Sequence, residues 1–187
     1  MKEIEIKLAF DSPSAARERL VEAGAVESEG RAFEDNALFD RENHPLHRAQ
    51  KLLRLRRVGN RCWLTYKAPV PGEHRHKVRL EHETSIGDPD SMRSILEGVG
   101  FVPSYRYQKY RTAFTVDDLH VCLDETPLGC FVELEGAPTS IDRVAGILGF
   151  SPEDYIRESY QQLHESAVDE RGGDPGELVF DPGEAEG

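Results

Sequence analysis

Apolar and charged residues alternate along much of the chain, which is typical of strands that bury one face of a sheet. Within residues 2–9, Ile4, Ile6 and Leu8 alternate with charged side chains. Seven further segments show strand character and are separated by turn-forming residues: 31–40, 51–58, 61–68, 77–86, 104–115, 118–124 and 129–135. The sequence therefore predicts eight strands.

Proline and capping residues mark the starts of helices between and after these strands. Helices are expected at about 13–23, 89–98, 139–148 and 152–166. The pair Glu3-x-Glu5 recurs as Glu81-x-Glu83, and each pair precedes a helix that begins with proline and then three strands. This recurrence suggests a duplicated β-α-β-β-β unit.

Composition limits the classes of function. The chain has 187 residues, 23 Lys+Arg against 35 Asp+Glu and a formal net charge of -12, so its overall field repels nucleic acid. No apolar stretch reaches the roughly 18 residues that span a bilayer, and the charged N-terminus does not resemble a signal peptide. We therefore expect a cytoplasmic protein without nucleic-acid or membrane partners. The three cysteines form no C-x-x-C pair and are expected to be free.

The negative charge is concentrated at the C-terminus. Residues 169–187 hold seven acids and one base among glycines and prolines, which predicts a disordered acidic tail after a folded domain at 1–168. The bases comprise six lysines and seventeen arginines. Together with the acid surplus, this ratio suggests the hypothesis of a halophilic protein, which loss of folding in dilute buffer would support.

Within the predicted strands, charges of both signs fall on a single face. The acids are Glu3, Glu5, Glu81, Glu83, Asp124, Glu133 and Glu135, and the bases are Lys7, Arg54, Arg56, Lys67, Arg79, Lys109 and Arg111. One interpretation is a salt-bridged face exposed to water. The other is a surface that holds a metal-bound polyphosphate. Tyr105 and Tyr107 share the parity of Lys109 and are assigned to packing.

The types of charged residue favour the second interpretation. Arginine dominates the bases, and its planar guanidinium suits two-point contacts with phosphate oxygens. The E-x-E pairs place two carboxylates about 7 Å apart on one face, where they can share a hard cation such as Mg2+ or Mn2+.

The order of these motifs resembles a known family. Glu3-Ile4-Glu5-Ile6-Lys7 resembles the E-x-E-x-K signature of the CYTH superfamily, the triphosphate tunnel metalloenzymes, which includes class IV (CyaB-type) adenylyl cyclases, thiamine triphosphatases and inorganic tripolyphosphatases. The match continues in order through Leu53-Arg54-Leu55-Arg56-Arg57, Leu64-Thr65-Tyr66-Lys67-Ala68-Pro69, Glu81-x-Glu83, Lys109-Tyr110-Arg111, Asp124, Val132-Glu133-Leu134-Glu135-Gly136 and Glu158-Ser159-Tyr160. It spans residues 1 to about 165.

This resemblance implies an α+β fold, an eight-stranded antiparallel β-barrel with flanking helices and the charges inside. The implied metal ligands are Glu3, Glu5, Asp124, Glu133 and Glu135, with Glu81 and Glu83 in support. The implied triphosphate-binding groups are Arg54, Arg56, Lys67, Lys109 and Arg111, to which Arg79 is added because it shares their face. Lys7 is the implied catalytic residue, aiding the attacking oxygen. The cofactor is then Mg2+ or Mn2+.

The resemblance favours a class IV (CyaB-like) adenylate cyclase that converts ATP to cyclic AMP and pyrophosphate, because the motif at 64–69 is similar to that subgroup. The alternative is a triphosphatase acting on tripolyphosphate or thiamine triphosphate, and a second alternative is a non-catalytic binder of polyphosphate or nucleotides. The expected partner is thus a small-molecule triphosphate. CyaB-like relatives suggest a homodimer, and the loop at 41–50 lies where a lid over the tunnel would be expected.

Overall fold

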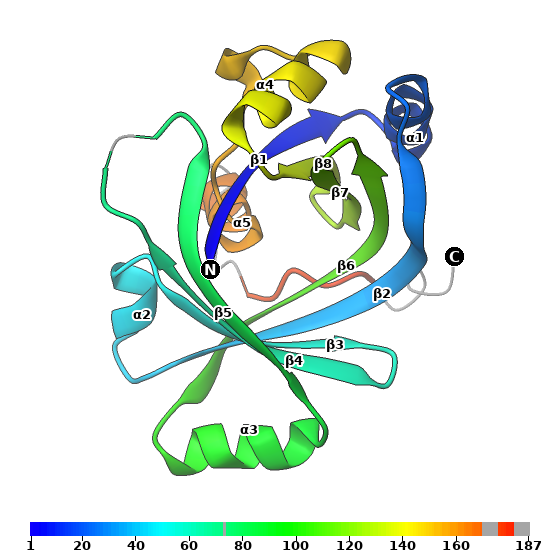
Figure 1. Ribbon diagram of the computed structural model, residues 1–187. Helices are drawn as coiled ribbons and strands as arrows, with labels where there is room; N and C mark the ends of the chain where they lie inside the picture. Colours follow the sequence, from blue (N-terminus) through cyan, green and yellow to red (C-terminus); the bar gives the residue numbers. More distant parts are fainter. Residues whose placement is uncertain (73, 170–175, 182–187) are drawn as a thin grey trace.

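The computed structural model describes residues 1–72, 74–169 and 176–181, and its strands close into a single barrel (Figure 1). The strands are β1 (Lys2–Phe10), β2 (Val26–Asp40), β3 (Leu52–Val58), β4 (Arg61–Pro69), β5 (Lys77–Ile86), β6 (Val102–Val116), β7 (Leu119–Thr126) and β8 (Gly129–Glu135). Neighbouring strands are antiparallel throughout this barrel. The predicted eight-stranded antiparallel barrel is therefore confirmed.

The strand order has the symmetry that the suggested internal duplication requires. Around the barrel the strands follow β1-β5-β4-β3-β2-β6-β7-β8. This order is unchanged when the first four strands exchange places with the last four. It is the order expected if the predicted β-α-β-β-β units pair through their first strands, β1 with β5, and their second strands, β2 with β6.

The helices lie around the wall of the barrel, except the last one, which is seen within the outline of the barrel (Figure 1). They are α1 (Pro13–Glu22), α2 (Pro45–Arg48), α3 (Pro89–Gly98), α4 (Pro138–Ile147), α5 (Tyr160–Asp169) and a 3-10 turn, η1 (Pro152–Asp154). None of the helices in the described part of the chain is long and apolar enough to cross a membrane.

The apolar faces of the strands point outward to the helices. Ile6 and Leu8 of β1 are fully buried with Leu134 of β8 and with Ile141 and Val144 of α4 in the main hydrophobic cluster. Because side chains alternate along a strand, the charged residues of β1 face the lumen. Packing of α1 and α4 on this side of the barrel thus decides which face lines the tunnel.

The helix predicted at 152–166 is wrong in its first half. The chain forms only the short turn η1 there and then runs extended, because Ile156 pairs with Lys7 through N–H donors in both directions at 2.9 and 3.0 Å. The helix begins instead at Tyr160. The preceding residue, Ser159, donates hydrogen bonds from its N–H and its hydroxyl to the side-chain oxygen of Gln162. The second predicted strand also begins earlier, at Val26, in an exposed part of β2 that pairs irregularly with β6.

Part of the predicted tail is packed. Residues 176–181 lie against β6, and Leu178 is 3% exposed, so the expectation of disorder is wrong for this segment. Although this segment is acidic, it contains two apolar residues, Leu178 and Phe180, that attach it to the barrel. Residues 170–175 and 182–187 lie outside the described residues, and the domain boundary at 168 stays a prediction. The three cysteines are free and buried.

Candidate active site

A cavity of about 680 Å³ lies in the lumen and collects charged side chains from both halves of the barrel. All but one of the predicted site residues line it: Glu3, Glu5, Lys7, Arg54, Arg56, Lys67, Arg79, Glu81, Glu83, Lys109, Arg111, Glu133 and Glu135. Asp124 is the exception. The alternating pattern along the strands therefore brings together residues that are far apart in sequence.

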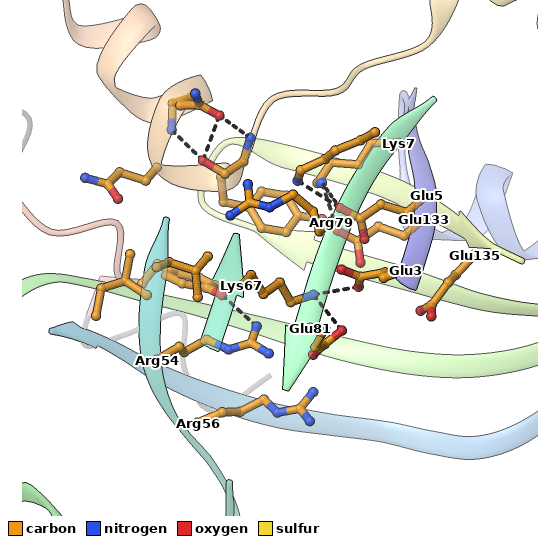
Figure 2. A pocket seen from close by; sticks show the side chains of 18 of the residues that line it. Glu3, Glu5, Lys7, Arg54, Arg56, Lys67, Arg79, Glu81, Glu133 and Glu135 are labelled. Carbon is orange, nitrogen blue, oxygen red and sulfur yellow. Dashed lines mark hydrogen bonds and ion pairs between the residues drawn. The ribbon is translucent and has the colours of Figure 1, made fainter. Parts of the chain in front are cut away.

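Lysines and carboxylates pair along the β1 side of the cavity (Figure 2). Lys7 Nζ lies 3.1 Å from Glu133 and 3.6 Å from Glu5, and it is 2% exposed. Burial lowers the pKa of Lys7, but the Glu133 and Glu5 carboxylates raise it by a larger amount, so the pKa of Lys7 lies above its usual value. Burial raises the pKa of Glu5, but Lys7 and Lys77 outweigh this effect and lower it overall. Lys7 is thus held as an ammonium ion.

Lys67 occupies the space between two carboxylates at the end of the cavity near the N-terminus (Figure 2). Its Nζ lies 2.5 Å from Glu3 and 3.3 Å from Glu81. Burial and the nearby Glu5 carboxylate raise the pKa of Glu3 to about 7, although Lys67 opposes this shift. Glu3 is therefore a carboxylate whose ionised form is poorly stabilised by the protein alone.

Two arginines of β3 are held in place by a polar network. Arg54 donates to the hydroxyls of Tyr107 at 3.2 Å and Thr65 at 3.3 Å. Thr65 in turn donates to Glu83 at 2.6 Å, and Arg56 donates to the same carboxylate at 3.0 Å. These contacts fix the two guanidinium groups while leaving both on the cavity wall.

Asp124 lies under the cavity wall rather than on it. Its side chain is 0% exposed and accepts hydrogen bonds from Lys109 at 2.8 Å, from Arg111 through two nitrogens, and from Tyr160 at 2.7 Å. Both carboxylate oxygens are therefore engaged. The arrangement suits an aspartate that orients two bases, and the metal-ligand role that the resemblance implied for Asp124 stays a prediction.

Arg79 differs from the other bases in its environment. Its Nε and Nη2 atoms are buried and have no hydrogen-bond partner among the described residues. Burial lowers the pKa of Arg79, which reflects the cost of holding its charge there. Buried guanidinium nitrogens that lack acceptors are stabilised when an anion binds beside them.

The charged lumen has the same order of motifs as a known family. The family model described as CYTH domain matches residues 1–160, which include every motif from Glu3 to Tyr160. The chain belongs to the CYTH domain family.

Two of the similar proteins carry names that refer to adenylate cyclases. This CYTH domain is 27% identical over 174 residues to "Putative adenylate cyclase MJ0240" of Methanocaldococcus jannaschii, covering 87% of this chain and 98% of that protein. The solved structure of PH1819 from Pyrococcus horikoshii matches with a TM-score of 0.75 and 25% identity over 88% of this chain and 99% of that chain. HpAC1 from Hippeastrum, whose structure is described as that of a "putative adenylyl cyclase" with "a dominant triphophatase activity", matches with a TM-score of 0.66 and 26% identity, covering 88% and 96%.

The carboxylates of this CYTH domain fit a hard cation through two groups in particular. Glu135 lines the cavity and makes no side-chain hydrogen bond or ion pair within the described residues, and burial raises its pKa. Glu3 Oε2 is buried without a partner in the same part of the structure. Oxygen donors of this kind suit Mg2+ or Mn2+. Across residues 1–72, 74–169 and 176–181, however, no three Asp, Glu, His or Cys side chains are already gathered as a metal site.

Two residues that line the cavity of the CYTH domain, and one buried behind its wall, were not predicted from the sequence. Lys77 lies on the same face of its strand as Arg79, so the alternating pattern could have identified it as a site residue. Its Nζ lies 2.8 Å from Glu5. Tyr107 was assigned to packing but lines the cavity and bonds to Arg54. Glu34 is buried 3.6 Å from Lys109, and although burial raises its pKa, Lys109 and Arg111 outweigh that effect and lower it to about 2. Nothing in the local pattern around Glu34 distinguished it.

Proposed function

We propose that this protein is a divalent-metal-dependent enzyme that acts on a small-molecule triphosphate, most closely a class IV (CyaB-like) adenylate cyclase. The observation that carries the proposal is the gathering of basic side chains around one cavity, where the buried Nε and Nη2 of Arg79 have no hydrogen-bond partner in the part of the chain that the structure describes. A chain of phosphates would supply the missing acceptors. Each such charge-assisted hydrogen bond contributes about 1.5–3 kcal/mol.

The net charge of -12 does not oppose this assignment. Coulomb energy depends on distance, and at an effective dielectric near 20 two unit charges about 4 Å apart interact by about 4 kcal/mol before desolvation. The bases on the wall therefore outweigh more distant surface acids for a ligand inside the barrel. The overall charge still disfavours extended polyanions outside it.

Glu3 and Glu135 are proposed as the carboxylates that hold the cation, Mg2+ or Mn2+, with Glu5 and Glu133 beside them. When bound, such an ion acts as a Lewis acid that neutralises charge on phosphoryl oxygens. Lys67 and Lys77 balance these carboxylates in its absence. The roles of Glu81 and Glu83 are to hold Lys67 and Arg56 in position.

Lys7 acts in this proposal as an ammonium group. Because Glu133 and Glu5 raise its pKa, it is suited to donate hydrogen bonds to the attacking or bridging oxygen and unsuited to remove a proton from it. Arg54, Arg56, Arg79, Lys109 and Arg111 hold the phosphate oxygens, so that nucleophile and leaving group lie in line.

The identity of the nucleophile distinguishes two activities. Attack by the ribose 3'-hydroxyl on the α-phosphorus of ATP gives cyclic AMP and pyrophosphate, and the name of the M. jannaschii relative supports this reaction. Attack by water on a terminal phosphorus gives orthophosphate, and the activity described for HpAC1 supports this second candidate. Non-catalytic binding is the remaining alternative, and cytoplasmic location and a homodimer stay predictions from the sequence.

One product assay tests the proposal. The protein is incubated with ATP, tripolyphosphate or thiamine triphosphate in Mg2+ or Mn2+, and the products are separated. Cyclic AMP with pyrophosphate supports the cyclase, and orthophosphate as the main product contradicts it and supports the triphosphatase. Arg54→Ala is expected to abolish turnover, whereas Arg93→Ala, on the exposed face of α3, serves as the matched control. Metal-dependent binding without turnover would identify a binder.

A further inference from the structure

Residues 176–181, here called the strap, lie along β6 beyond the part of the chain that matches the family model (Figure 1). Leu178 pairs in parallel with Tyr107. Its N–H donates to the carbonyl of Arg106 at 3.0 Å, and its carbonyl accepts from the N–H of Gln108 at 2.8 Å. Because β7 pairs with β6 only from Tyr110 onward, the strap takes the edge of β6 that β7 leaves open.

Side chains anchor the strap on both sides of this backbone pairing. Leu178 is buried in a cluster whose members include Tyr107 and Tyr160. The ring centroid of Phe180 lies 5.3 Å from that of Tyr110, and the N–H of Phe180 donates to the side chain of Gln108 at 3.2 Å. The strap is therefore attached by apolar burial as well as by main-chain hydrogen bonds.

The two tyrosines beneath Leu178 also contact the phosphate-binding groups. The hydroxyl of Tyr107 accepts from Arg54, and that of Tyr160 donates to Asp124, whose carboxylate orients Lys109 and Arg111. Each tyrosine thus has its ring in the cluster that contains Leu178 and its hydroxyl bonded to a residue that is a phosphate-binding base or orients two of them. The ring centroids of the pair lie 6.1 Å apart.

We propose that the strap is a positioning element of the active site: by packing on Tyr107 and Tyr160 it fixes their hydroxyls, and through them Arg54 and Asp124, in the arrangement that receives a triphosphate. Leu178 touches neither substrate nor reacting atoms and acts only through the tyrosines. Preorganised cations lose less conformational freedom when the ligand binds, which improves affinity. This inference rests on the proposed function, because that function supplies the triphosphate ligand. The docking of the strap on β6 is independent of the proposed function.

The test compares the full-length variant Leu178→Ser with Val179→Ser, its neighbour outside the buried cluster. Amide exchange of Gln108 is expected to become at least about tenfold faster in Leu178→Ser and to stay unchanged in Val179→Ser, while amides of β1 stay protected in both. Affinity for tripolyphosphate is expected to fall about tenfold in Leu178→Ser, because the ligand must then order the bases that the two tyrosines no longer hold in place. Adding a peptide of residues 176–181 should restore it.

Each outcome decides the proposal. If Gln108 exchanges faster but tripolyphosphate affinity and KM are unchanged, the strap only stabilises the fold and the positioning role is overturned. Unchanged exchange of Gln108 overturns docking itself. If the wild-type protein binds no tripolyphosphate, the proposed function and the positioning role fail together, whereas exchange at Gln108 still reports docking. Should Leu178→Ser unfold, Phe180→Leu, which weakens only the contact with Tyr110, provides the second variant.

Discussion

The hydroxyl of Tyr160 donates a hydrogen bond of 2.7 Å to Oδ2 of Asp124. The donor is the first residue of α5 and the acceptor lies on β7, so this bond ties the last long helix to the barrel wall. The same carboxylate faces Lys109 and Arg111 on β6. One buried aspartate therefore connects a helix, two strands and two bases of the cavity.

Asp124→Asn is expected to lower the free energy of unfolding by up to about 3–5 kcal/mol, because it removes the carboxylate that Lys109 and Arg111 share and leaves each with one other acidic partner, Glu34 and Glu133. Tyr160→Phe removes one hydrogen bond to the carboxylate and is expected to cost about 1.5–3 kcal/mol. Urea unfolding in the presence of a chelator measures both. An increase in stability on adding Mn2+ should persist in both variants. Its loss in Asp124→Asn alone would show that Asp124 is a metal ligand.

Glu3 predicts a pH dependence of the metal-free protein. Its folded-state pKa of about 7 lies above the usual value of 4.5, so the folded state binds the extra proton between these pH values. Stability should therefore decrease as the pH rises from about 5 to 8, by roughly 1–3 kcal/mol for this group. Unfolding of the wild type and of Glu3→Gln in a chelator measures the effect. The variant should lose this part of the slope, and equal slopes would contradict the assignment.

Glu135 is expected to contribute to cation binding. A ligand at 100 times its dissociation constant stabilises a folded protein by about 2.7 kcal/mol. Adding Mg2+ or Mn2+ to the chelated protein should thus raise the unfolding midpoint, and Glu135→Gln should reduce this response. Glu97→Gln, at an exposed ion pair of α3, is the control and should respond as the wild type does. An undiminished response in Glu135→Gln would remove it from the proposed ligands.

Arg79 should show opposite effects on stability and on binding. Arg79→Met removes buried, unpartnered nitrogens and is expected to raise the free energy of unfolding by about 1–3 kcal/mol. The same change should weaken tripolyphosphate binding about tenfold to a hundredfold, as expected for a lost charge-assisted hydrogen bond. Calorimetric titration and urea unfolding measure the two quantities. A loss of stability without a change in affinity would assign Arg79 to the fold.

Much of the barrel could be predicted because period-2 alternation is a local property of each strand. Glu3, Glu5 and Lys7 share a parity whatever surrounds them. That their face is inside the barrel could not follow from parity, because it depends on α1 and α4 covering the other face. The resemblance to the CYTH superfamily supplied that step.

The errors in the prediction arise from contacts between distant segments. Ile156 runs extended because it pairs with Lys7, and no feature of residues 152–158 indicates this partner. Leu178 is buried because β7 leaves an edge of β6 open, although its neighbours are acidic and rich in glycine. The motif around Asp124 gives its residue type but not the three donors around it, Lys109, Arg111 and Tyr160, and its metal-ligand role stays a prediction. In each case, contacts with residues distant in sequence determine the conformation or the surroundings of the residue.

The closure of the barrel between β1 and β8 has a consequence for how the protein folds. The first strand of the barrel in chain order pairs with the last one, and Lys7 meets Glu133 only at that closure. Contacts so distant in sequence are slow to form. Until then β1 can pair with β5 but its other edge stays open, and Lys7 lacks Glu133, so the charged site is incomplete in any partly folded chain that lacks β8. Binding competence should therefore appear in a single late step, and a nascent chain released before residue 129 should have none.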